Sequence, residues 1–302
     1  MVIGKIKAGL GLAAVLCWAH VGYGAANPEL AVVCPENVAP IPKAPRSKVY
    51  EAVPYKSGEV SKYELKYGAL KVLVGYGFLR VEPPQNYKVK VPDAKGKAVE
   101  EQRWHMVLHA EAYTGDWYKM IFAGHDKIQA LIRPWDLGVS KFYMNQNEEK
   151  PFVRRYVSEK WLDFDHFNCK VASKEIDHAK EKTKTGDYDF QAGALDTLGA
   201  VFHLRTFEYK LNQAVRFAVY SSEKNWMLEA TPVAFEKVTV NAGTFDTVKL
   251  KLQTYIGKDL QQKGDVWVWV ATKLPSKPLV KIEGEVTFGS IYLLLDTYKA
   301  GK

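Results

Sequence analysis

The sequence predicts a mainly β protein: a strongly curved antiparallel sheet, open or closed like a barrel, with one short helix. Seventeen tyrosines and eight tryptophans favour strands over helices. Apolar and polar residues alternate with period two over much of the chain, which is typical of half-buried strands. Short turns containing glycine or proline separate these segments, so we expect sequential strands to pair as hairpins in two meanders.

The first residues predict a signal peptide over 1–26. Lys5 and Lys7 precede a short apolar run, and small residues follow it, so cleavage is expected after Gly24 or after Ala26. The apolar run is too short to span a bilayer, and no later stretch is long and apolar enough for a transmembrane helix.

These features predict an exported protein, periplasmic or secreted. Lipidation is not expected, because Leu16 precedes Cys17 where a lipoprotein signal needs a small residue. Loss of Cys17 with the leader leaves Cys34 and Cys169, and two cysteines in an oxidising compartment predict one disulfide. The alternative is a pair of buried free thiols.

A proline-rich extended lead-in is expected over 27–54, and the β domain over 55–302. The length permits one body or two β subdomains that meet near 173–193. Pro83 and Pro84 are expected to end a strand, and the charged stretch 174–187 is interpreted as an exposed turn or a mobile loop. The strands of the first meander are expected at 61–67, 70–81, 102–113, 117–123, 128–132, 139–145, 152–157 and 161–172.

One short helix is predicted between the meanders, over about 194–205. Asp196 can cap it, and Leu198, Val201, Phe202 and Arg205 follow at helical spacing. The strands of the second meander are expected at 214–220, 226–229, 235–240 and 247–255, followed by the closing pair within 265–295. In that pair Val266, Val268 and Val270 face one side and Trp267 and Trp269 the other, so both sides are apolar and expected to be covered.

Four stretches resemble an exported bacterial family of unknown function, DUF3108. They are Tyr63-Glu-Leu-Lys-Tyr-Gly with Gly75, the helix 196–205, the turn 240–250, and Trp267-Val-Trp through Leu274-Pro to Gly289-Ser-Ile. The resemblance implies an exported, mostly antiparallel β protein with a short helix. It implies no catalytic residues, so none are carried over. Gly199 stands where the family pattern Asp-x-Leu-Ser has its serine.

Two clusters of polar residues are candidates for a metal site. His105, His109 and Glu111 share a strand face and could offer ligands to zinc, but the two histidines lie roughly 13 Å apart along a strand, so a wet polar face is expected instead. Asp163, Asp165 and His166 lack the glycine-bracketed loop of a calcium site.

No motif for a serine nucleophile or a phosphate-binding loop occurs in the sequence, so no catalytic, cofactor or metal residue is predicted. Asp196 and Arg205 are interpreted as a helix cap and a charge at the helix C-terminus. Trp267 and Trp269 are interpreted as core, with a stacking platform for a ligand as the alternative.

The formal net charge of +8 falls to about +6 when the leader is removed, because Lys5 and Lys7 leave with it and no acid precedes Glu29. The lysines are spread along the chain, so no nucleic-acid partner is expected.

Three hypotheses for function remain. The first is a non-enzymatic envelope protein whose curved sheet holds an apolar or amphipathic ligand, such as a lipid or envelope precursor, because several strands are apolar on both faces. The second is a scaffolding protein that binds an envelope protein through a sheet edge. The third is a hydrolase with a dispersed site.

Overall fold

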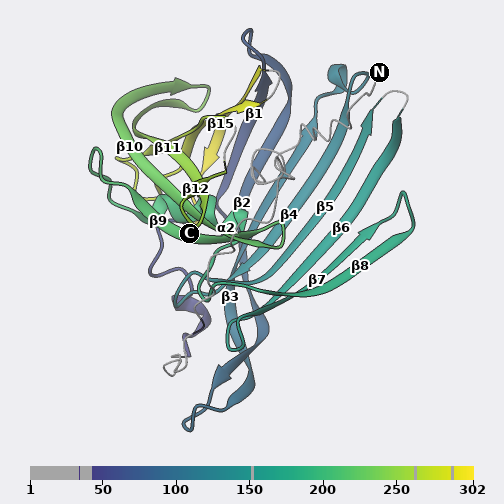
Figure 1. Cartoon of the computed structure of the whole chain (residues 1–302). Helices are drawn as coiled ribbons and strands as arrows, with labels where there is room; N and C mark the ends of the chain where they lie inside the picture. The colour runs from purple at the N-terminus through teal and green to yellow at the C-terminus, as the bar shows by residue number, and fades with distance from the viewer. Residues whose placement is uncertain (1–33, 35–42, 151–152, 262–263, 287–288) are drawn as a thin grey trace.

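The computed structural model describes residues 34, 43–150, 153–261, 264–286 and 289–302, and the predicted leader lies outside them. Their strands form one fifteen-stranded antiparallel sheet (Figure 1). The strands are β1 Val60–Tyr67, β2 Val72–Pro92, β3 Ala98–Thr114, β4 Ala123–Ile132, β5 Val139–Lys150, β6 Val153–Asp165, β7 Lys170–Asp177, β8 Lys182–Asp189, β9 Val215–Ser221, β10 Lys224–Val240, β11 Gly243–Ile256, β12 Asp259–Leu260, β13 Val266–Ala271, β14 Leu279–Val286 and β15 Gly289–Lys299. The short helices are η2 Arg46–Lys48, η3 Asp116–Tyr118, α2 Thr197–His203 and η4 Leu204–Thr206.

Alternation of side chains explains the strands. On β3, Met106, Leu108 and Ala110 are fully buried on the inner face of the sheet. On β13, Val266, Val268 and Val270 are buried on the same face as one another, with at most 6% of their surface exposed. A strand with one apolar face gains stability only when that face is buried. The hairpins therefore curve so that their apolar faces pack against one shared core.

Strand β1 joins the two meanders into one sheet. It pairs with β2 on one side and with β15 on the other, so the order runs β8-β7-β6-β5-β4-β3-β2-β1-β15-β14-β13-β11-β10-β9. The sheet is therefore open, with β8 and β9 at its edges. A core cluster of buried residues draws on both meanders, so the described strands share one core.

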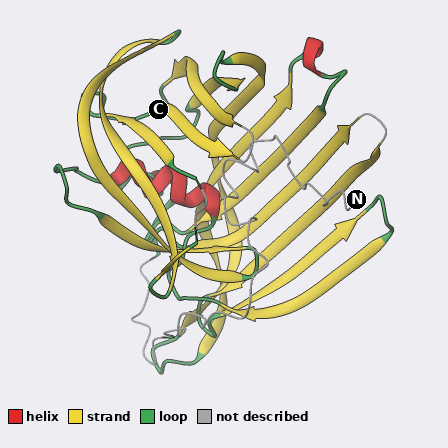
Figure 2. Ribbon diagram, turned by 45° about the horizontal axis from the view of Figure 1, so that its top comes forward, coloured by secondary structure: helices red, strands yellow, loops and turns green. Residues whose placement is uncertain are grey.

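The predicted helix is present as α2, followed by η4. Asp196 caps it, since its Oδ1 accepts hydrogen bonds from the backbone N–H groups of Leu198 and Gly199 at 2.7 and 3.0 Å. Leu198 and Phe202 are buried against the sheet, and the helix contacts β3, β4 and β9. It lies between the two halves of the sheet (Figure 2).

Strand β2 corrects one expectation, because it runs through Pro83 and Pro84 instead of ending there. The β1–β2 ladder stops at Arg80, so beyond that point β2 pairs only with β3. A register shift between Glu82 and Gln85 accommodates the prolines. Proline is tolerated on the unpaired side of a strand and at a bulge, and both conditions hold here.

The charged stretch 174–187 is a second correction. It forms most of the β7–β8 hairpin, with eight paired residues on each strand. Its lysines and acids face solvent at the sheet edge, where strands need few apolar residues. The lead-in also contributes to the core, because Val49, Tyr50 and Val53 are buried there.

Candidate functional site

The two edges of the sheet meet through side chains along a line that we call the seam. Glu223, in the turn between β9 and β10, accepts from Lys160 of β6 at 3.1 Å and from Lys184 of β8 at 3.4 Å. Asn225 of β10 accepts from the Gln191 backbone N–H at 2.7 Å. The seam residues are Lys160, Lys184, Asp189, Gln191, Glu223 and Asn225.

Backbone contact across the seam is short. Leu195 makes one isolated bridge with β9, donating to the Ala218 carbonyl and accepting from the Tyr220 N–H. No ladder between β8 and β9 occurs among the described residues. Elsewhere the sheet is joined by continuous ladders, so the seam is the one place where side chains take over that role in the described part of the chain.

The turn between β9 and β10 places the Glu223 carboxylate beside Lys160 and Lys184. Ser222 and Glu223 both have positive φ, +52° and +61°, which is the geometry of a two-residue type I′ hairpin. Burial raises the pKa of the Glu223 carboxyl, but Lys160 and Lys184 outweigh it and hold that pKa below its usual range. Glu223 is therefore a carboxylate at neutral pH.

Aromatic rings of the core lie close to the seam. Phe164 of β6, Phe190 after β8 and Tyr220 of β9 pack edge to face, with ring centroids 5.2 to 6.2 Å apart. All three are buried. The rings come from both sides of the seam, so this part of the core would be exposed if the edges separated.

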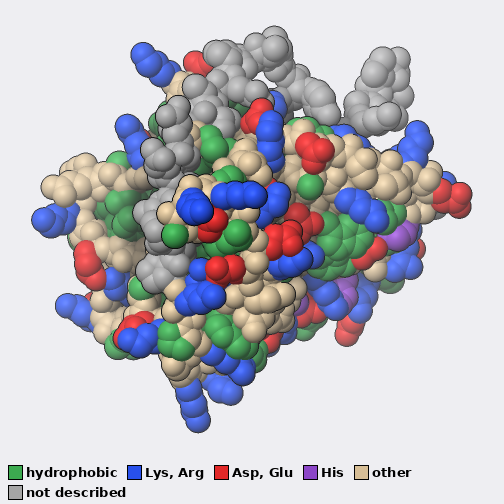
Figure 3. All heavy atoms as spheres, turned by 90° about the horizontal axis from the view of Figure 1, so that it is seen from below, with side chains coloured by type: hydrophobic (Ala, Val, Ile, Leu, Met, Phe, Trp, Pro, Cys, Tyr) green, Lys and Arg blue, Asp and Glu red, His purple; other side chains and the backbone are tan. Residues whose placement is uncertain are grey.

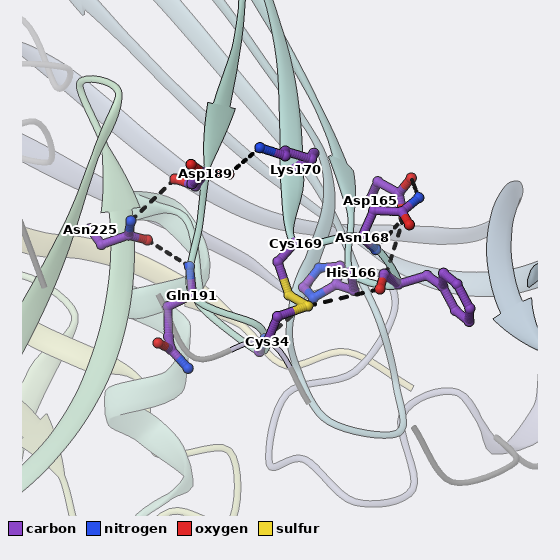
Figure 4. The surroundings of a disulfide bond; sticks show 11 residues. Cys34, Asp165, His166, Asn168, Cys169, Lys170, Asp189, Gln191 and Asn225 are labelled. Carbon is purple, nitrogen blue, oxygen red and sulfur yellow. Dashed lines mark hydrogen bonds and ion pairs between the residues drawn. A yellow bond between two sulfur atoms is a disulfide. The ribbon is translucent and has the colours of Figure 1, made fainter. Parts of the chain in front are cut away.

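The disulfide predicted between Cys34 and Cys169 lies near one end of the seam (Figure 4). The two sulfur atoms are 2.13 Å apart, and Cys169 sits in the turn between β6 and β7. In the same view Asn225 donates to the Asp189 carbonyl, and Lys170 pairs with the Asp189 carboxylate. Its formation in the protein in solution stays a prediction.

The residues weighed for zinc do not share a site. His105 is fully buried, in contrast to the wet face expected for it. Glu111 accepts from Arg80 and from His125, both at 2.7 Å, which ties it to neighbouring strands. Among the described residues, no group of three His, Cys, Asp or Glu side chains could hold a metal ion.

His105 instead makes a serine–histidine pair that the sequence did not reveal. Its Nε2 lies 2.8 Å from the hydroxyl of Ser140 and its Nδ1 lies 2.8 Å from the Arg103 carbonyl. Burial, with a smaller effect of the Arg133 charge, lowers the pKa of His105 to about 4, and the hydrogen bond to the Arg103 carbonyl opposes this only in part. Ser140 is also buried, with 1% of its surface exposed, so a substrate could not reach the hydroxyl without a rearrangement of the fold.

Asp163, Asp165 and His166 have structural roles. Asp163 accepts from the Tyr87 hydroxyl at 2.5 Å. Asp165 accepts from Lys90 and from backbone N–H groups of the β6–β7 turn. The His166 Nε2 contacts the Val139 carbonyl at 2.5 Å. These bonds hold the turn that carries Cys169.

Arg205 lies at the C-terminal end of the helix, as expected, and it is also half of a buried ion pair. It is 2% exposed and pairs with Glu59, which is equally buried, at 2.7 Å. It also donates to the carbonyls of Ser276 and Lys277. A guanidinium has five donors, and a buried one is stable only when most of them are bonded. Arg205 thereby joins the helix end to Glu59, directly before β1, and to the β13–β14 loop.

Lysine side chains lie over the rings of both β13 tryptophans, Trp267 and Trp269. The Nζ of Lys281 lies 4.1 Å from the Trp269 ring centroid, and the Nζ of Lys249 lies 4.3 Å from that of Trp267. Trp269 is buried and donates to Glu236. Lysine side chains occupy positions over the rings where a ligand would stack, so the packing interpretation is favoured.

Comparison with known proteins rests on a family profile. The profile described as "Protein of unknown function (DUF3108)" matches residues 62–296. The chain belongs to the DUF3108 family. In this DUF3108 protein, Gly199 occupies the position where a serine was expected. A serine there would be crowded, because its Cβ would lie 3.2 Å from Ile132 of β4. The described residues contain no helix long and apolar enough to cross a membrane.

Two solved structures are similar to this DUF3108 chain at low identity. A β-barrel-like protein of the DUF1849 family from Brucella abortus has 8% identity and a TM-score of 0.48, with 82% of this chain and 99% of that one covered. A putative exported protein with a YmcC-like fold from Bacteroides fragilis has 12% identity and a TM-score of 0.34, with 82% and 98% covered. No curated protein matches the chain.

The seam could not be found from the sequence. Lys160, Lys184 and Glu223 are separated by 24 and 39 residues, and each looks like an ordinary surface charge. Their meeting depends on how far the sheet curves, which local patterns do not encode. Only the Ser222–Glu223 turn between two strand patterns gives a local signal.

Proposed function

We propose that this DUF3108 protein is a non-enzymatic exported envelope protein that binds an apolar or amphipathic molecule, a lipid or envelope precursor, within its curved sheet. The observation that carries the proposal is the seam, because buried aromatic rings lie beside a junction that side chains rather than a strand ladder hold closed. The ligand would enter where β8 and β9 part.

The energetics of the seam support this entry route. Ion pairs at partly exposed positions contribute about 0–1 kcal/mol each, so the side-chain contacts resist parting less than a full ladder of backbone hydrogen bonds would. Parting the edges also breaks the two Leu195 backbone hydrogen bonds and exposes the three rings. An apolar ligand would then cover the rings of Phe164, Phe190 and Tyr220, which recovers the burial lost on opening. The leader and the cysteine pair support an exported location.

Native mass spectrometry of protein recovered from the periplasm tests the proposal. A retained lipid-sized adduct that dissociates on activation is expected. A seam variant, Glu223→Lys, places a third cation beside Lys160 and Lys184 and should speed the uptake of an apolar fluorescent dye several-fold, because repulsion loosens the seam. Glu100→Lys is the matched control, since Glu100 pairs with Lys88 on an exposed hairpin remote from the seam.

A clean apo mass together with equal dye uptake by both variants would contradict ligand binding. Circular dichroism and the urea midpoint of each variant show whether the fold is retained. If the apo protein co-purifies with a stable protein partner instead, scaffolding is the better account.

The scaffolding alternative has one specific observation in its favour. The outer edge of β8 has no strand partner among the described residues, and a bare edge can accept a strand from another protein. However, β8 carries Lys182, Lys184, Asp187 and Asp189, and charges on an edge strand oppose such pairing. The hydrolase alternative has only the buried Ser140–His105 pair.

A further inference from the structure

Exposed apolar side chains gather at one end of the sheet, in two loops on neighbouring strands. Five of the ten large, exposed apolar side chains among the described residues lie here, and we call this group the tip. Their exposed fractions range from 40% for Val72 to 89% for Leu70. The tip consists of Leu70, Val72, Trp117, Met120 and Ile121.

The two loops are held together by the sheet. The β1–β2 turn spans 68–71, and the β3–β4 loop spans 115–122 around η3. Gly115 at the start of the second loop donates to the Val74 carbonyl of β2 at 2.9 Å. Both loops project from the same end of the sheet (Figure 1). The pair of loops therefore presents one apolar end.

The loops are folded turns that aim these side chains outward. Gly68 and Lys71 have positive φ, and the Lys71 N–H donates to the Gly68 carbonyl at 2.9 Å. In the second loop, Ile121 and Phe122 donate to the Tyr118 carbonyl. Phe122 is 4% exposed and anchors the loop, whereas Met120 is 83% exposed. The exposure thus belongs to an ordered structure.

Charge around the tip selects its partner. Segments 64–72 and 115–122 carry three lysines, Lys66, Lys71 and Lys119, against two acids, Glu64 and Asp116. Lys119 pairs with Asp116 at 2.6 Å and Lys66 with Glu64 at 2.8 Å, while the Nζ of Lys71 lies 4.9 Å from the Tyr292 ring. Lysines that flank apolar side chains and a tryptophan suit a surface with acyl chains below anionic headgroups.

We propose that the tip docks this protein on an anionic lipid surface, with Trp117, Met120 and Ile121 inserted below the headgroups and Lys71 against their phosphates. This contact does not require a ligand in the sheet. It goes beyond the proposed function and places the protein at a bilayer surface.

Co-sedimentation with vesicles tests the docking. Protein recovered from the periplasm should bind phosphatidylglycerol vesicles at least tenfold more strongly than phosphatidylcholine vesicles, and less at high salt. The double variant Met120→Glu/Ile121→Glu should lose at least tenfold in binding, because carboxylates would enter the apolar layer. Leu211→Glu is the control: Leu211 is 48% exposed in the loop before β9, outside the tip, and its variant should stay within twofold of the unaltered protein.

A second readout assigns the contact to the tip. The tryptophan emission should shift to the blue on phosphatidylglycerol vesicles, and Trp117→Phe should remove most of that shift. The seam variant Glu223→Lys should keep its vesicle binding, so failure of docking and failure of ligand binding are separate results. The proposal is overturned if unaltered protein binds neither vesicle, if Leu211→Glu weakens binding equally, or if the tip variant abolishes a dimer instead.

Discussion

Asp126 shows how a single residue can make this sheet sensitive to pH. It lies on β4 with 2% of its surface exposed, and its Oδ1 accepts from the Asn147 N–H at 3.2 Å. Burial raises the pKa of Asp126 to about 7, and the neighbouring Glu148 carboxyl adds to the rise. The Asn147 N–H acts in the opposite direction but is outweighed.

We predict that Asp126 costs stability as the pH rises. Its folded pKa lies above the unfolded value of 3.8, so its contribution is complete below about pH 4 and is lost as the pH rises toward about 7. Asp126→Asn removes this loss, so the variant should gain roughly 2–4 kcal/mol relative to the parent between pH 4 and pH 8. Urea unfolding across that range measures the difference. A difference that does not change with pH would contradict the shift.

Arg205 supports a second prediction at this scale. Arg205→Ala leaves Glu59 as a buried carboxylate without its partner and should cost about 3–5 kcal/mol in the free energy of unfolding. Lys48→Ala breaks an exposed pair with Glu51, at 3.8 Å, and should cost less than about 1 kcal/mol. Denaturant unfolding of both variants checks the contrast. Similar losses in the free energy of unfolding for the two variants would mean that the buried pair contributes no more than an exposed one.

At the scale of elements, the close approach of the β3 backbone leaves no room for a side chain at one position of β2. Gly75 lies where β2 pairs with β3, opposite Thr114. A Cβ at Gly75 would lie 2.2 Å from the Tyr113 carbonyl oxygen, far inside contact distance. That neighbour is backbone within a ladder, so it cannot move aside as a flexible side chain can.

Gly75→Ala should therefore destabilise the protein by about 1–3 kcal/mol or more, through a local shift of β2 from β3. Gly115→Ala is its control, because a Cβ there meets its nearest atom at 3.7 Å and Gly115 has φ −66°. Thermal unfolding separates the two: the control should stay close to the parent. A tolerated Gly75→Ala would show that the strands adjust.

At the scale of the whole molecule, the cysteine pair closes a long loop. Cys34 and Cys169 are 135 residues apart in sequence, and the crosslink would attach the lead-in to the β6–β7 turn. In the chain-entropy model such a loop stabilises by about 5 kcal/mol.

Reduction should consequently lower the melting temperature by roughly 10 °C. Cys34→Ser should show the lower value with or without reductant, which controls for other effects of the reductant. Thiol titration of denatured protein that lacks the predicted leader should find no free thiol before reduction and two after it. Two free thiols at the start would restore the alternative of unpaired cysteines.

Surface charge at this scale agrees with the spread of lysines in the sequence. Lysine and arginine side chains alternate with acidic ones over the face seen in Figure 3. Mixed charge of this kind gives a solvated surface rather than a field of one sign.

Local patterns were enough for most of the strands, the helix and its cap, but the strand expected at 117–123 is instead the loop around η3, and β4 begins only at Ala123. Period-two alternation marked β3 and β13, and Asp196 followed by apolar residues at helical spacing marked α2. The patterns failed where a partner strand decides the outcome. Pro83 and Pro84 lie within a strand because β1 ends before them, and the charged β7–β8 hairpin forms because β6 offers an edge.

The sequence by itself determined that this chain forms antiparallel strands with one capped helix, and it carried the resemblance to DUF3108. Hydrogen bonding and side-chain alternation within a few residues are enough for that, because they depend only on near neighbours. Only the tertiary structure decided that the sheet stays open, that Glu223 meets Lys160 and Lys184, and that Arg205 is buried against Glu59. These contacts join residues far apart in the chain, and they depend on the curvature accumulated over fifteen strands.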